Sequence, residues 1–218
     1  MKKAVCLISG GPDSATAAAV AKREGYEIHC LTFDYGQLAS REIQSARKIA
    51  KALGAREHKI VDISFLKDLY GPGVTALTDK TIPMPSRFTP AVIVPFRNGI
   101  MISIAVAYAE RIGADAIFYG PQLDDAKFYP DCRRKFAAAM TKAIQLGTEK
   151  KIEVKNPLAG LPKFKVLKLA RELGVPLEVT WSCYRDGKYH CGHCESCNNR
   201  KMAFKKAGIP DPTRYLHP

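Results

Sequence analysis

The sequence lacks any long uninterrupted apolar run. The longest runs, at residues 91–96 and 100–107, are too short or too interrupted to cross a bilayer core of about 30 Å, so we expect no membrane-spanning segment. A short apolar run at residues 4–9 is broken by the Gly-Gly-Pro of residues 10–12 before the hydrophobic region of a signal peptide would be complete. We therefore expect a cytoplasmic protein.

Acidic residues are also scarce relative to basic ones. The chain has 21 Asp and Glu against 34 Lys and Arg, which gives a net charge of +13. This excess favours anionic partners such as nucleotides, nucleic acids or acidic lipid headgroups. The basic residues are spread over several expected helix faces, however, so a solvated surface explains the charge as well as a nucleic-acid footprint does. Charge alone names no partner.

Cysteine is sparse along most of the chain and crowded near its end. Four of the seven cysteines fall within fifteen residues: Cys183, Cys191, Cys194 and Cys197. A disulfide scaffold would spread its cysteines through a short chain, so this tetrad predicts a metal site. Four thiolates complete a tetrahedral zinc shell with no open position, which indicates a structural zinc ion. His190 and His193 are expected to be solvated or to lie next to the ligands, and replacement of a thiolate by one of them is the alternative. An iron–sulfur cluster is the alternative, although the Cys and Pro that follow in a ferredoxin run are missing.

Apolar runs rich in β-branched residues alternate with helical periodicity in the rest of the chain. The expected strands are residues 4–9, 27–34, 57–63, 116–120 and 152–155, and the expected helices are residues 14–24, 40–53, 98–111, 132–146, 164–173 and 194–206. The stretch 71–95 has five prolines and no helical period, and such long connections are commonly functional or mobile. The pattern predicts an α/β fold: a Rossmann-like parallel sheet with helices on both faces over residues 1–179, and a small zinc-binding module over residues 180–218.

A Gly-rich segment, residues 9–14 (SGGPDS), separates the first expected strand from the first expected helix. Backbone amides and a positive helix end at this place form an anion cradle, although an ordinary strand-to-helix turn is the alternative. The segment lacks the Gly-Lys-Ser/Thr ending of the Walker loop and the Gly-x-Gly-x-x-Gly dinucleotide fingerprint. It therefore indicates a phosphate loop of another class.

The segment resembles the pyrophosphate loop of ATP pyrophosphatases, the PP-loop enzymes that cut ATP between its α and β phosphates. The resemblance implies an adenine nucleotide alpha-hydrolase-like fold that binds ATP with magnesium. It implies ATP-binding residues Ile8, Ser9, Gly10, Gly11, Pro12, Asp13, Ser14 and Phe33. Among them Asp13 and Ser14, with the later Lys163, are implied as catalytic, and Asp13 is placed to help bind magnesium. A solvated lysine at a helix start is the alternative for Lys163.

Further segments narrow the resemblance from this group to one family. They are residues 33–37 (FDYGQ), 94–98 (VPFRN), 129–133 (YPDCR), the cysteine tetrad followed by Arg200, and residues 211–215 (DPTRY). Together they resemble the QueC family of 7-cyano-7-deazaguanine synthases along nearly the whole chain. The resemblance implies ATP-dependent conversion of 7-carboxy-7-deazaguanine and ammonia to the nitrile, through adenylated acid and amide intermediates, in queuosine or archaeosine biosynthesis. We expect a homodimer and no tRNA contact.

Three residues are expected to bind the deazapurine: Arg97, Asp131 and Arg133. Arg97 suits an anionic oxygen and Asp131 suits donors on the ring edge, whereas a surface salt bridge and a helix cap are the respective alternatives. Phe128 stands where the family commonly has Gly, and its bulk is expected to narrow the pocket or to alter which deazapurine fits.

Two other functions fit part of the pattern. A tRNA-thiolating or other tRNA-modifying PP-loop enzyme would suit the positive charge, and its activity would depend steeply on salt. A zinc-dependent nucleic-acid-binding module on a decayed nucleotide fold would need no catalysis, and absence of ATP turnover would distinguish it.

Overall fold

The computed structural model describes residues 1–217 and is built on one parallel sheet. The strands are β1 (Lys3–Leu7), β2 (Glu27–Asp34), β3 (Glu57–Asp62), β4 (Ala116–Phe118) and β5 (Glu153–Lys155), in the order β3-β2-β1-β4-β5. All neighbouring strands run parallel, with Cys6 opposite Cys30 on one side and Phe118 on the other. The chain order reverses between β1 and β4, which is where open α/β sheets form their ligand crevice.

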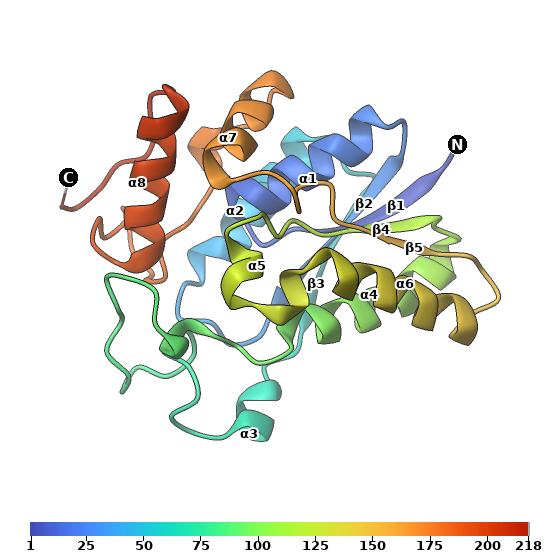
Figure 1. The fold of residues 1–218 in the computed structure, drawn as a ribbon, viewed down its shortest axis with the longest axis horizontal. Helices are drawn as coiled ribbons and strands as arrows, with labels where there is room; N and C mark the ends of the chain where they lie inside the picture. The colour runs from blue at the N-terminus through green and yellow to red at the C-terminus, as the bar shows by residue number, and fades with distance from the viewer. Residues whose placement is uncertain (218) are drawn as a thin grey trace.

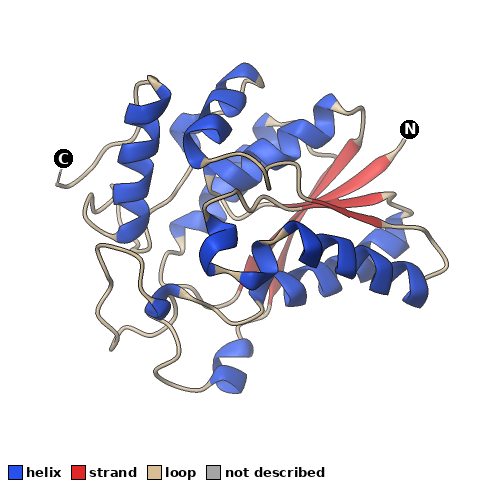
Figure 2. Cartoon of the chain, viewed as in Figure 1, coloured by secondary structure: helices blue, strands red, loops and turns tan. Residues whose placement is uncertain are grey.

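Helices cover both faces of this sheet (Figures 1 and 2). They are α1 (Pro12–Arg23), α2 (Arg41–Ala52), α3 (Leu66–Tyr70), α4 (Arg97–Ile112), α5 (Asp125–Phe128), α6 (Arg134–Gly147), α7 (Lys163–Glu172) and α8 (Glu195–Ala207). Short 3₁₀ turns occur at Pro90–Val92, Pro130–Cys132 and Leu177–Val179. Helices α1, α2, α7 and α8 share one hydrophobic core, and α4 and α6 share the other.

Strand β1 shows why its sequence reads as a continuous apolar run. Ala4 and Cys6 point into the core of α1 and α2, whereas Val5 and Leu7 point into the core of α4. Successive side chains of a strand face opposite sides, so a strand covered on both faces must be apolar at every position. The expected α/β fold with a two-sided parallel sheet is confirmed.

The helix boundaries differ from the expected ones in an informative way. Helix α1 begins at Pro12 rather than Ser14, because proline is favourable in the first helical turn, where its missing N–H has no partner to lose. Two short helices, α3 and α5, were not predicted. Each has fewer than two turns, too few residues for a hydrophobic period to show.

Backbone hydrogen bonds hold the long connection at residues 71–95 against other parts of the chain. Ala76 donates its amide to Ala91 at 2.7 Å, and Leu38 donates to Leu77 at 2.8 Å. Farther along, the carbonyl of Pro85 accepts the amide of Glu195 at 2.9 Å. The connection therefore runs from the carboxyl edge of the sheet to the start of α8.

The C-terminal segment is joined to the sheet layers through its helix. Phe204 of α8 is buried in the same core as β1, and Arg200 is only 1% exposed. The Arg200 guanidinium donates to Thr180 at 2.8 Å and pairs with Asp211 at 3.2 Å. The domain boundary expected near residue 180 stays a prediction.

One segment, Pro90–Ile112, is long and apolar enough by composition to cross a membrane. The core helix of a soluble protein can have the same length and composition. Only α4, with 16 residues, is continuous helix in this segment, short of the roughly 20 residues that a span requires. Ile102, Ala105 and Ala109 of α4 are fully buried against the sheet, which accounts for its apolar sequence.

Candidate active site and metal centre

The Gly-rich loop between β1 and α1 is held by its own two serines. The Ser9 amide donates to Ser14 Oγ at 3.1 Å, and the two hydroxyls lie 3.0 Å apart. Gly10 has a φ of +93°, and a Cβ there would lie 2.2 Å from the backbone oxygen of Glu42. Glycine is therefore required at Gly10 both for the backbone conformation and for the close approach of α2. The start of α1 follows directly, as in helix N-terminal anion sites.

Asp13 connects this loop to a distant part of the chain. It forms an ion pair with Lys163 at the start of α7, while its Oδ1 atom is buried without a hydrogen-bond partner in residues 1–217. Burial and the charge of Asp13 raise the pKa of neighbouring Asp125 to about 6. A buried carboxylate oxygen that lacks a donor suits a hard cation, so Asp13 fits a magnesium ligand.

A first cavity, here called the inner cavity, has a volume of about 280 Å³ and lies at the carboxyl ends of β1, β2 and β4. Its apolar lining includes Ile8, Leu31, Phe33, Val94, Met101 and Tyr119. Its polar lining includes Arg97 and Asp131. Apolar side chains at one part of the cavity suit a flat heterocycle such as adenine, and the loop serines Ser9 and Ser14, which also line it, suit phosphate oxygens.

A second cavity, the outer cavity, has a volume of about 700 Å³ and lies on the other side of the Gly-rich loop. It is bounded by α5, the start of α7, α8 and the connection 71–95. Ser9 and Asp13 line both cavities, so the loop stands between two chambers. Two adjoining cavities at one loop bring a nucleotide phosphate and a second ligand close together.

Arg97, at the start of α4, also lines both cavities. Its guanidinium donates to the Tyr35 hydroxyl at 2.9 Å and lies 5.1 Å from the centre of that ring. It forms no ion pair within residues 1–217. Burial raises the pKa of Glu42, on the same cavity walls, to about 8, although the Arg97 charge opposes this. Arg97 is thus a half-buried cation that forms no ion pair within residues 1–217, which leaves it available to an anionic ligand.

Asp131 and Arg133 lie in different surroundings. Asp131 lines the inner cavity, and its Oδ2 accepts the backbone amide of Asn98 at 2.9 Å in the first turn of α4. Arg133 lines neither cavity, and its Nε donates to the Ala126 carbonyl at 3.3 Å. Asp131 therefore lines the site and also caps the start of α4. Arg133 instead contacts the backbone of α5 and lines neither cavity. Their binding roles stay predictions.

Phe128 stacks against the long connection. Its ring lies 3.9 Å from that of Phe88, centre to centre, at an interplanar angle of 24°, and both rings line the outer cavity. Tyr129 meets Phe88 edge-on at 5.9 Å. The bulk at Phe128 therefore contributes a flat apolar wall to this cavity.

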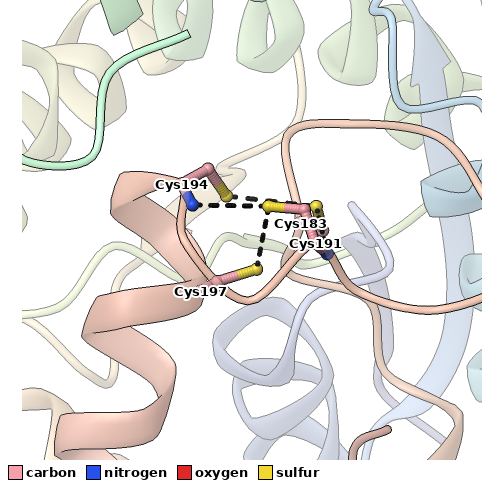
Figure 3. Close-up of side chains that lie close together, drawn as sticks. All are labelled: Cys183, Cys191, Cys194 and Cys197. Atoms are coloured by element: carbon pink, nitrogen blue, oxygen red, sulfur yellow. Dashed lines mark hydrogen bonds between the residues drawn. The ribbon is translucent and has the colours of Figure 1, made fainter. Parts of the chain in front are cut away.

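The four clustered cysteines form a compact buried group (Figure 3). Their sulfur atoms all lie within 4.8 Å of one another, and two pairs, Cys183–Cys194 and Cys191–Cys197, are 3.9 Å apart. Sulfurs around one zinc ion with bonds of about 2.3 Å would be separated by about 3.8 Å. Backbone amides of Cys191 and Cys194 donate to neighbouring sulfurs at 3.3 Å, as expected for groups that carry thiolate charge. The cluster could hold a metal such as zinc.

Comparison with known proteins gives a consistent result. The profile of the family described as "Queuosine biosynthesis protein QueC" matches residues 3–208. A 7-cyano-7-deazaguanine synthase from Sulfurovum sp. (strain NBC37-1) is 48% identical over 221 residues, with 98% of each chain covered. One from Thermoplasma acidophilum is 46% identical, with 98% of this chain and 92% of the relative covered.

The chain belongs to the QueC family. Solved structures with lower identity share the fold of this QueC chain. A 4-thiouridine synthetase in complex with RNA and ATP has a TM-score of 0.57 at 21% identity, covering 95% of this chain and 50% of that one. An NMN synthetase from Francisella tularensis has a TM-score of 0.51 at 16% identity, covering 96% and 78%. The expected adenine nucleotide alpha-hydrolase-like fold is confirmed.

Sequence reasoning missed part of the outer cavity of this QueC chain. Its wall includes Tyr184, Glu195 and Asn199, which were not among the expected site residues. Tyr184 directly follows Cys183, and Glu195 directly follows Cys194. Their position next to the clustered cysteines was a usable signal, because a compact buried cluster fixes the backbone beside it. Asp125 was missed because nothing in the sequence relates it to Asp13.

Proposed function

We propose that this QueC protein is a 7-cyano-7-deazaguanine synthase acting in queuosine or archaeosine biosynthesis. Membership in an enzyme family whose curated relatives carry that name supports the proposal. The structural observation that carries it is the Gly-rich loop, with its Asp13–Lys163 pair, standing between two cavities. We assign the nucleotide to the inner cavity and the deazapurine carboxylate to the outer one. A tRNA-thiolating function is not favoured by these relatives.

The chemistry follows from the poor electrophilicity of a carboxylate. A carboxylate oxygen attacks the α-phosphate of ATP, diphosphate leaves, and ammonia then displaces AMP from the acyl adenylate to give the amide and a proton. The amide oxygen attacks a second ATP in the same way. Loss of AMP and a proton from the resulting imidate leaves the nitrile. Both oxygen atoms of the original carboxylate depart on AMP.

The protein's contribution is electrostatic. Amides of the loop and the Lys163 ammonium face the diphosphate as its charge develops, which lowers the barrier to its departure. Arg97 is placed to hold the anionic group of a substrate or nucleotide between the cavities. Cys132 lines the inner cavity, but burial raises the pKa of its thiol, so it does not act as a nucleophile.

Two metals belong to the proposal. Magnesium bound with ATP would be held partly by Asp13, whose buried Oδ1 atom lacks a donor in residues 1–217, and it would neutralise phosphate charge. Zinc would be held by the four cysteines, whose separations match a tetrahedral site, and it would fix the fold of the segment after residue 180.

The remaining parts of the proposal concern partners and location. Free ammonia is the nitrogen source, the nucleobase reacts without tRNA, and the protein acts in the cytoplasm as a homodimer. The outward side of α4 is the surface proposed for the dimer, and sedimentation of the purified protein as a monomer would rule this out.

The proposed function is tested by incubating metal-loaded protein with 7-carboxy-7-deazaguanine, ATP, magnesium and ammonium, and following nucleobase and AMP by mass spectrometry. We expect the nitrile and AMP to appear together, with little dependence on salt concentration. AMP formation that requires tRNA and falls steeply with salt would identify a tRNA-modifying enzyme instead. No ATP turnover in either condition would overturn an enzymatic function.

A further inference from the structure

Glu195 is a buried carboxylate that the proposed chemistry does not use. It begins α8, is 8% exposed and lines the outer cavity. Its Oε2 accepts the Tyr184 hydroxyl at 2.8 Å, and its Oε1 accepts the side-chain amide of Asn199. No Lys, Arg or His nitrogen in residues 1–217 lies within 4.0 Å of it.

Such a carboxylate is incompletely satisfied. An ionised carboxylate accepts about four hydrogen bonds, two at each oxygen, and Glu195 receives one neutral donor at each. A buried charge is costly unless donors or a cation surround it. One free acceptor position at each oxygen suits a ligand with two parallel N–H groups.

The surroundings of Glu195 fix its position. Its own amide donates to Pro85 of the long connection at 2.9 Å, and its neighbour along the chain is the cluster cysteine Cys194. Tyr184, which orients the carboxylate, likewise follows the cluster cysteine Cys183. The carboxylate and its orienting hydroxyl are therefore both anchored by the cysteine cluster rather than by a loop free to move.

The same cavity offers a flat apolar surface. The stacked rings of Phe88 and Phe128 line it, as does Phe164 at the start of α7. Aromatic rings in the same cavity as a carboxylate with two open acceptor positions match a planar heterocycle that carries adjacent N–H donors. A guanine-type ring presents such a pair: the ring N–H and the neighbouring exocyclic amino group.

We propose that Glu195 binds the ring N–H and the 2-amino group of the deazapurine, and so selects guanine-type substrates. This assignment rests on the proposed function. Tyr184 is a positioning residue that aims the carboxylate. Asp131, expected from the sequence to take the ring edge, has one oxygen already committed to the amide of Asn98 and lines the inner cavity instead.

The test combines protein variants with a ligand analogue that lacks the 2-amino group. Equilibrium binding and KM are measured for 7-carboxy-7-deazaguanine and for its analogue without the 2-amino group, using wild type, Glu195→Gln and Asp131→Asn. In wild type, removal of the amino group is expected to weaken binding about ten- to hundredfold, as for a hydrogen bond to a charged group. Glu195→Gln is expected to bind 7-carboxy-7-deazaguanine weakly. In this variant, removal of the 2-amino group is expected to weaken binding by only about threefold or less.

Two further variants keep the result interpretable. Tyr184→Phe removes only the hydroxyl that orients the carboxylate, so KM is expected to rise while kcat changes little. Glu172→Gln, on the exposed side of α7, is the matched control and should behave as wild type. Metal content and melting temperature establish that each variant is folded, and these readouts do not depend on turnover.

The possible outcomes distinguish the role assigned to Glu195 from the proposed synthase function. If wild type forms the nitrile and Glu195→Gln still discriminates between the two ligands, the assignment is wrong and the function stands. Loss of discrimination in Asp131→Asn but not in Glu195→Gln would transfer the role to Asp131. Absence of nitrile formation by wild type would overturn both.

Discussion

The two sides of the outer cavity are built by different means. The loop side uses backbone: two glycines, a helix start and serines that bond to one another within six residues of chain. The α8 side uses side chains, which project from a frame of four cysteines. A site formed by backbone amides needs a contiguous sequence motif. A site formed by side chains needs only a rigid structure that holds those side chains in place. The first side is therefore readable in a sequence, and the second is visible only in the fold.

The largest expected effect comes from removing the frame. Cys194→Ser should lose the metal and unfold the segment after residue 180, because structural zinc sites contribute about 10–16 kcal/mol, as much as a whole domain's stability. Metal analysis and hydrogen exchange of that segment measure the effect. Cys30→Ser, a buried cysteine of β2 outside the cluster, is the control and should keep its metal. Retention of metal by Cys194→Ser would contradict a four-cysteine site.

The second-largest effect is expected from removing the positive charge of Lys163 on the loop side. Lys163→Met should lower kcat about a hundred- to a thousandfold, because it removes the cation that faces the departing diphosphate. Steady-state kinetics with saturating ATP measure this loss. Lys168→Met, elsewhere on α7 and outside both cavities, is the matched control. An unchanged kcat in Lys163→Met would limit Lys163 to its ion pair with Asp13 and contradict a role at the diphosphate.

The loop backbone itself should be intolerant of a side chain. Gly10→Ala places a Cβ 2.2 Å from the Glu42 carbonyl at a φ of +93°, which we expect to cost about 1–3 kcal/mol of stability and weaken ATP binding. Gly147→Ala, where a Cβ meets nothing within 4 Å, should change stability by less than about 0.5 kcal/mol. Urea unfolding and ATP titration measure both. Equal effects in the two variants would contradict a conformational requirement at Gly10.

A pH dependence should distinguish the loop side further. Because the pKa of Asp125 is raised from 3.8 to about 6, the folded protein holds its proton longer than the unfolded chain does, so this group makes stability fall as pH rises from about 4 to 6. Asp125→Asn should remove roughly 1–3 kcal/mol of that decline, measured by urea unfolding at both pH values. Asp68→Asn, an exposed carboxylate in α3, should leave the decline intact. An unaltered pH profile in Asp125→Asn would show that Asp125 is not the group responsible.

The smallest expected effect concerns the aromatic wall of the outer cavity, where Phe128 of α5 stacks on Phe88 of the connection 71–95. Phe128→Leu removes the stack on Phe88 but keeps an apolar side chain, so we expect a loss of about 0.5–1.5 kcal/mol and a few-fold rise in the KM of the deazapurine. Phe65→Leu, an exposed phenylalanine just before α3, is the control. A fall in KM would instead support the expectation that Phe128 narrows the pocket.

The sequence predicted those parts of the fold that repeat a short-range physical rule. Every sheet strand was expected within a few residues of its place. For β1 and β4 the reason is that a strand buried on both faces must be apolar throughout, whereas the edge strands β3 and β5 carry charged residues and follow from their alternation with helical segments. The cysteine tetrad was expected from spacing alone. The ends of helices were less predictable: α1 begins at Pro12, where the pattern favoured Ser14. Helix starts depend on which amide finds a partner, and that is settled by the loop before them.

From local pattern alone, the site was predictable only where it is contiguous; the distant Lys163 and Arg97, which the structure brings to the loop and the cavities, were expected from the family resemblance and its motifs. Residues 9–14 lie together in the chain and together at the site, whereas Glu195 reaches the outer cavity through a fold of the last segment that no local pattern encodes. Arg133 illustrates the converse, since its motif neighbour Asp131 lines the inner cavity while Arg133 donates to the carbonyl of Ala126. Adjacent residues of a 3₁₀ turn and a helix start point in different directions.

The central claim is adenylation of a carboxylate, and the fate of its oxygen atoms tests that claim most directly. Turnover of 7-carboxy-7-deazaguanine labelled in its carboxylate with a heavy oxygen isotope, followed by mass spectrometry of the products, shows where each oxygen goes. The account predicts that the label leaves on AMP in both the amide-forming and the nitrile-forming step. Unlabelled AMP, or label in diphosphate or water, would contradict it.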